Sequence, residues 1–192
     1  WAGPLMTRYL ADFGADILKV ESQILPDRDT QPGNPLGGEF AYRNRGKRSI
    51  TANVQKPEAL ALLEGLIRKS DVVVENFRAG VLESWGLGYE RMRQIKPDII
   101  YITMPGFGIE GPHSSFMSYG QLLLAYSGMM YLWGHSESPV RTRPKVAYPD
   151  STSAAMAAFA IMAALEYRRR TGKGQFIEIA QLENFIATMG TA

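Results

Sequence analysis

The strongest constraint on the fold is the alternation along the chain of short apolar segments and longer segments with helical spacing. VVVEN (72–76) and IIYITM (99–104) are continuous apolar runs, typical of parallel strands buried on both faces. Further strands are expected at 16–21, 49–54 (an edge strand) and 175–180. Helices are expected at 5–13, 57–69, 89–95, 121–131, behind Asp150 and from residue 182. This order predicts an α/β fold: a parallel sheet with helices on both faces.

The remaining organisation is that of one incomplete domain. Residues 22–46 contain Pro26, Pro32 and Pro35 with several glycines, which predicts a long loop within that domain. The chain opens with WAGPLMTRYLADFGA and stops in a segment with helical character, LENFIATMGTA. We therefore expect residues 1–192 to be a partial domain that begins inside a fold.

Composition excludes several classes of site. There is no cysteine, so disulfides, thiolate metal sites and a cysteine nucleophile are ruled out, and the two histidines make a histidine-rich metal site unexpected. A formal net charge of +2 gives no reason to expect nucleic acid as a partner. No apolar run reaches the roughly 18 residues that a bilayer span requires, and no signal peptide is apparent. We expect a cytoplasmic protein without a membrane partner.

Two loops, at 75–80 and 170–175, are candidates for ligand binding. No GxGxxG follows a strand and no GxxxxGK[ST] is present, so a standard dinucleotide or phosphate loop is not supported. The basic turn at 170–175, RTGKGQ, is better explained as a helix-to-strand connection. ENFRAG (75–80) follows a buried strand, at the edge of a parallel sheet where ligands gather. It is either a polar turn or a ligand-binding loop that offers Asn76, Phe77 and Arg78.

Asp150 stands directly before the Ala-rich run 154–164. An aspartate at that place is commonly a helix cap, worth about 0.5–2 kcal/mol, and the helix dipole favours its ionised form. The same features suit a reactive carboxylate, so local pattern alone leaves the cap and the catalytic role both open.

Taken together, these segments resemble the family III CoA-transferases, the group that includes formyl-CoA transferase. The matching pieces, in order, are AGPLMTRYLADFGADILKVE, NRGKRSI, SDVVVENFRAGVLESWGLGYE, KPDIIYITMPGFGIEGP, YPD and RRRTGKGQFIEIAQLE. The resemblance implies the Rossmann-like large domain of that family, without its first strand and its small domain. For the complete protein it implies two subunits threaded through each other as an interlocked homodimer.

The resemblance also implies a reaction and a set of site residues. CoA would pass from an acyl-CoA to a carboxylic acid through an anhydride and a thioester on one aspartate, which matches Asp150. No metal or permanently bound cofactor would be required, and coenzyme A or acyl-CoA would be the substrate. The expected CoA-contacting residues are Trp1, Ala2, Asn76, Phe77, Arg78, Val81 and Tyr119.

Some positions depart from the formyl-CoA transferase pattern, notably Gly120, which stands where that pattern has a glutamate. The others are Ser22, Gln55, Ser84 and Met117. One alternative is an α-methylacyl-CoA racemase of the same superfamily, but SYGQ (118–121) lacks the histidine that this reaction uses. A non-catalytic truncated paralogue is the other alternative.

Overall fold

A computed structural model of the protein describes residues 1–22, 38–133 and 146–190. In these residues five strands form two parallel sheets, one with the order β1-β2 and the other with the order β3-β4-β5. The strands are β1 (Ile17–Glu21), β2 (Lys47–Thr51), β3 (Val72–Glu75), β4 (Ile100–Thr103) and β5 (Gln175–Glu178). The helices are α1 (Ala2–Asp12), α2 (Gly38–Asn44), α3 (Pro57–Lys69), α4 (Val81–Ser84), α5 (Tyr89–Ile95), α6 (Gly120–Tyr126), α7 (Met129–Leu132), α8 (Tyr148–Thr171) and α9 (Gln181–Thr188).

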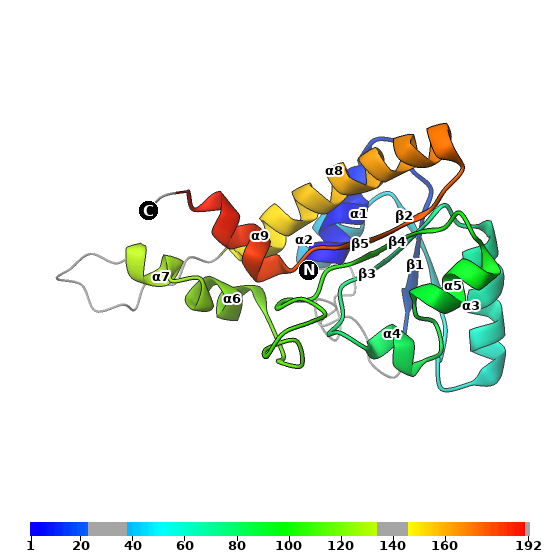
Figure 1. Cartoon of the computed structure of the whole chain (residues 1–192), viewed down its shortest axis with the longest axis horizontal. Coiled ribbons are helices and arrows are strands. Elements are labelled where there is room, and N and C mark those ends of the chain that lie inside the picture. The colour runs from blue at the N-terminus through cyan, green and yellow to red at the C-terminus, as the bar shows by residue number, and fades with distance from the viewer. Residues whose placement is uncertain (23–37, 134–145, 191–192) are drawn as a thin grey trace.

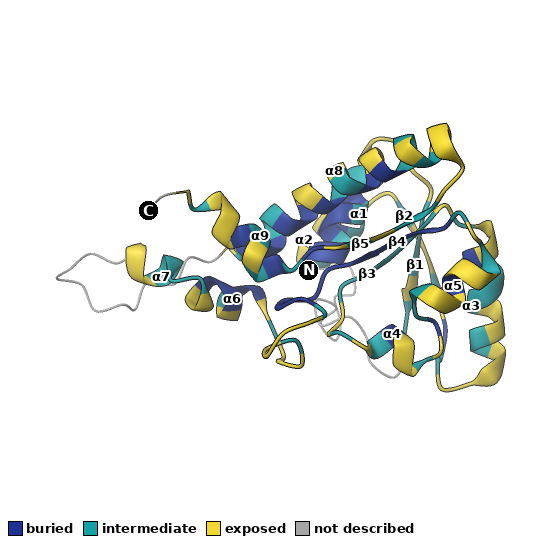
Figure 2. Ribbon diagram, viewed as in Figure 1, coloured by how far each residue is buried: buried dark blue, intermediate teal, exposed yellow. Residues whose placement is uncertain are grey.

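The three-stranded sheet has helices on both faces, which confirms the predicted fold class. Figure 1 shows α8 and α1 along one side of this sheet and α3 and α5 on the other. The side chains of β4 alternate accordingly. Ile102 packs among residues of α1 and α8, whereas Tyr101 packs with residues of α3 and α5. Every residue of β4 is buried, as its dark blue ribbon in Figure 2 shows.

The sequence did not indicate that the strands divide into two sheets. Within the described residues no strand pairing joins β2 to β3. The sequence of β2, KRSIT, offers a reason: Lys47, Arg48 and Ser49 are costly to bury in the middle of a sheet. The expected edge strand 49–54 is thus present, but it begins two residues earlier and ends at Thr51.

Two other predictions require correction. The expected loop 22–46 contains α2 at Gly38–Asn44, while residues 23–37 lie outside the described residues. A helix of seven residues is too short for its periodicity to stand out among prolines and glycines. The expected helix 121–131 is two helices, α6 and α7, because Gly128 between them has a φ of 82°, in the left-handed region.

Helix α8 determines where the site lies. It leads through Gly172, a left-handed C-cap, into β5, so its first turn lies at the carboxyl edge of the parallel strands. Its buried residues recur at helical spacing and are mostly small, which allows α1 to pack closely against it. At its other end Arg168 forms an ion pair with Asp71, 2.7 Å between Nη2 and Oδ1, next to the start of β3. In the described residues no helix is long and apolar enough to cross a membrane.

Candidate active site

Asp150 lies in the first turn of α8, and it does not cap the helix. The helix begins at Tyr148, its N-cap is Ala147, and no side chain forms a cap hydrogen bond. Pro149 occupies the first turn at no cost in hydrogen bonding, since the N–H it lacks would have no partner within the helix. The cap interpretation is therefore wrong, because residue 150 is already inside the helix.

The carboxylate of Asp150 is buried, with 6% of the residue exposed. It accepts hydrogen bonds from its own backbone N–H and from that of Ala2, at the start of α1. Gly120, the first residue of α6, packs against its Oδ2 atom. The site thus forms where the first turns of α1, α6 and α8 meet.

Two opposing influences set the charge of this carboxylate. Burial is the larger one, and it raises the pKa of Asp150 above its ordinary value. The backbone N–H of Ala2 and the guanidinium of Arg43 each lower that pKa. A carboxylate in such surroundings is poorly solvated and yet has partners for its negative charge, which suits a nucleophile.

Arg43 is the functional candidate that sequence reasoning missed. It belongs to α2, is 1% exposed, and places its guanidinium carbon 3.6 Å from the centre of the Trp1 ring. Its Nη1 atom also donates to Glu39, at 2.9 Å. No sequence pattern marks this arginine, because its importance depends on the packing of α2 against α1.

The predicted CoA-contacting residues fall into two groups. Ala2 and Asn76 come close to the Asp150 region: a Cβ on Gly3 would lie 2.7 Å from Oδ1 of Asn76, so the loop after β3 meets the start of α1. Tyr119 precedes Gly120, and its ring, like those of Trp1 and Phe77, is about half exposed. Such rings can stack on a planar ligand.

The side chains of the other residues predicted to contact CoA lie at the surface or pack into the core. Phe77 packs edge-to-face with Trp85, with ring centres 5.5 Å apart, and Arg78 is exposed. Val81 packs with the apolar cluster of α3 and α5. The structure does not bring Val81 to Asp150.

A second carboxylate shapes the loop after β3. Glu75 accepts hydrogen bonds from the backbone N–H of Phe77, at 2.7 Å, and from the hydroxyl of Tyr101, at 3.1 Å. Burial raises the pKa of Glu75. These contacts hold the turn that contains Asn76. Residues 75–80 (ENFRAG) can therefore be both a polar turn and a ligand-binding loop.

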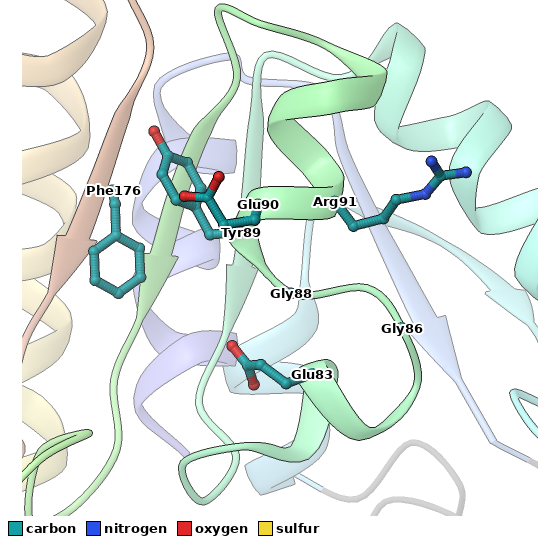
Figure 3. Close-up of a pocket in the computed structure, with 7 residues that line it drawn as sticks. All are labelled: Glu83, Gly86, Gly88, Tyr89, Glu90, Arg91 and Phe176. Carbon is teal, nitrogen blue, oxygen red and sulfur yellow. The ribbon is translucent and has the colours of Figure 1, made fainter.

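An open hollow lies on the other face of the three-stranded sheet. It is lined by Glu83, Gly86, Gly88, Tyr89, Glu90, Arg91 and Phe176. Figure 3 shows side chains from α4, α5 and β5 around it, with the two glycines in the loop between α4 and α5. None of the predicted site residues lines it, and α8 lies across the sheet from it.

Fold and site together define a parallel α/β protein with a buried carboxylate at the carboxyl edge of its sheet. The sequence model of CoA-transferase family III matches residues 1–192, and the chain belongs to this family.

Relatives of known activity support the assignment. The chain is 37% identical to the succinyl-CoA–D-citramalate CoA-transferase of Chloroflexus aurantiacus, over 98% of this chain and 48% of that protein. It is 38% identical to the succinate–glutarate CoA-transferase of Agrobacterium fabrum, over 95% of this chain and 48% of that protein. The crystal structure of a CAIB/BAIF family protein from Brucella suis matches with a TM-score of 0.91 and 35% identity, over 98% of this chain and 52% of that one. The chain thus spans about half the length of the relatives it matches.

Proposed function

We propose that the complete protein transfers CoA from an acyl-CoA thioester to a carboxylic acid, with Asp150 as the nucleophile. The observation that carries this proposal is the buried Asp150 carboxylate, held at the junction of α1, α6 and α8 in a chain that matches the family over its whole length. One ionised oxygen in a poorly solvated place is the chemical requirement of acyl transfer through a side chain.

In the first half of the proposed reaction, an Asp150 oxygen attacks the thioester carbonyl. The carbon–sulfur bond breaks and CoA leaves as a thiolate, which gives a mixed anhydride on Asp150. The thiolate then attacks the aspartyl carbonyl, releases the donor acid as a carboxylate, and leaves an aspartyl-CoA thioester.

The second half repeats these steps with the acceptor. Its carboxylate displaces the CoA thiolate to form a second anhydride, and the thiolate attacks the acceptor carbonyl. The products are the new acyl-CoA and a restored Asp150. No proton, electron or further co-reactant enters the balance.

The proposal extends to how CoA is held. We propose that Trp1, Ala2, Asn76, Phe77, Arg78, Val81 and Tyr119 contact CoA; the exposed rings of Trp1, Phe77 and Tyr119 and the exposed guanidinium of Arg78 support this for four of them. Val81 has the weakest support, since it packs in the apolar cluster.

Two relatives are named for succinyl-CoA or succinate, which favours a short dicarboxylic acyl group. We also propose an interlocked homodimer; light scattering on the complete protein should give the mass of two subunits, and the mass of one would contradict the proposal.

Hydroxylamine trapping in the complete protein tests the nucleophile. With succinyl-CoA and hydroxylamine, the native protein is expected to acquire a hydroxamate at Asp150, seen by peptide mass spectrometry. Asp150→Asn should acquire none and should lose CoA transfer by on the order of 10³-fold or more. Glu183→Gln, at an exposed carboxylate of α9, is the matched control and should behave like the native protein. Transfer at the native rate by Asp150→Asn would refute the proposal.

A further inference from the structure

The backbone of Gly120 lies so close to Asp150 and Ala147 that an added Cβ would collide with both. A Cβ at this residue would lie 1.9 Å from Oδ2 of Asp150 and 2.5 Å from the Cβ of Ala147. Both distances are far below any real carbon contact. Gly120 is not among the glycines with positive φ, so its backbone conformation is open to other residues. The obstacle to a side chain here is therefore steric: Oδ2 of Asp150 and the Cβ of Ala147 would both have to move to admit one.

The Asp150 carboxylate is thus confined from two directions. The backbone N–H of Ala2 donates a hydrogen bond to it, and the Cα of Gly120 leaves just enough room for Oδ2. The first contact attracts the carboxylate and the second sets how far it can turn toward α6. Together they select one orientation of a side chain that could otherwise adopt several rotamers.

We propose that Gly120 is a positioning residue that fixes the orientation of the Asp150 carboxylate by leaving empty the space its oxygen needs. This proposal rests on the proposed role of Asp150 as nucleophile. An alanine at position 120 has to push the carboxylate aside, because the obstructing atom on that side is the reactive oxygen itself. A displacement of about 1 Å at a reacting group can cost 10²-fold in rate.

The test compares Gly120→Ala with Gly65→Ala in the complete protein. Gly65 lies within α3, and a Cβ there meets nothing within 4 Å, so it reports the general effect of adding a methyl group to a helix. For Gly120→Ala we expect single-turnover release of CoA from succinyl-CoA to slow by about 10²-fold. Binding of free CoA, measured by calorimetry, should stay within about twofold, since CoA does not need the carboxylate orientation. Gly65→Ala should match the native protein in both measurements.

A second variant separates positioning from packing. Ala147→Gly in the Gly120→Ala background removes the other obstructing methyl group but leaves the conflict with Oδ2. We expect this double variant to regain the native melting temperature while CoA release stays slow. If it regains the native rate as well, Gly120 is only a packing residue and the proposal is overturned. It is equally overturned if Gly120→Ala releases CoA at the native rate.

A crystal structure of Gly120→Ala keeps this proposal distinct from the nucleophile assignment. A displaced Asp150 carboxylate supports the positioning role, and an unmoved one overturns it. If Asp150→Asn transfers CoA at the native rate, the proposed function fails, whatever the orientation of the carboxylate in the glycine variant.

Discussion

The backbone N–H of Ala2 donates a hydrogen bond to the carboxylate of Asp150, and so joins the first turn of α1 to the first turn of α8. The start of α1 also contacts Asn76 through Gly3, and Trp1 lies over the guanidinium of Arg43. Residues 1–3 therefore connect the candidate nucleophile with the loop after β3 and with α2. Variants of the complete protein test these contacts and the packing around them.

Replacing Arg43 should move the pH dependence of catalysis. Burial raises the pKa of Asp150, and the Arg43 guanidinium opposes that rise. In Arg43→Gln the opposing charge is gone, so the pKa of Asp150 should rise further and the acidic limb of the rate profile should move to higher pH. Arg43→Lys keeps the charge and should shift the limb less. Arg48→Gln, at an exposed arginine of β2, is the control; coinciding profiles for native protein and Arg43→Gln would contradict the prediction.

The variant Asp150→Asn should be at least as stable as the native protein at neutral pH. The pKa of Asp150 is higher in the folded state than its ordinary value of 3.8, so the folded protein binds the proton more tightly than the unfolded chain does. The contribution of the Asp150 carboxyl group to the stability of the fold is therefore present at low pH. It is lost as pH rises from about 3.8 through the folded-state pKa. An amide, which has no such charge to bury, avoids this loss. Thermal melting at pH 7 and in acid should show an advantage for the variant that shrinks as pH falls; a variant less stable than native at pH 7 would argue against it.

Gly3→Ala should weaken acyl-CoA binding. The added Cβ would lie 2.7 Å from Oδ1 of Asn76, so the amide has to move away from α1. If Asn76 contacts CoA as proposed, KM for succinyl-CoA should rise by about tenfold, equivalent to about 1.4 kcal/mol, with a smaller change in kcat. Gly38→Ala, where a Cβ meets nothing within 4 Å, should leave KM unchanged. An unaltered KM in Gly3→Ala would remove Asn76 from the CoA site.

Ala157→Leu should destabilise the contact between α1 and α8. Ala157 is fully buried, in the same apolar cluster as Ala2, Leu5 and Met6. Extra methyl groups in a filled core usually cost about 1–3 kcal/mol. Ala163→Leu, at an exposed position of α8, should stay within about 0.5 kcal/mol of native. The midpoints of urea-induced unfolding measure both, and equal midpoints would show that this contact tolerates the larger side chain.

Much of the fold could be predicted because it follows from local pattern. The apolar runs of β3 and β4 predicted buried parallel strands, and the helix 57–69 was predicted with the bounds that α3 has. Helix α2 was missed because seven residues beside a proline- and glycine-rich stretch give no clear periodicity. The single helix expected at 121–131 was wrong because a left-handed Gly128 interrupts it, and apolar spacing does not register backbone angles.

The sequence by itself determined the α/β alternation, the strands of the three-stranded sheet and the candidacy of Asp150, since these depend on neighbours along the chain and on motif order. Only the tertiary structure decided what surrounds that carboxylate: Ala2 as its donor, Arg43 as its nearby charge and Gly120 as the space for its oxygen. Those three residues lie on three different helices and the carboxylate lies on a fourth. Contacts between helices depend on how the whole core packs, which no local periodicity encodes.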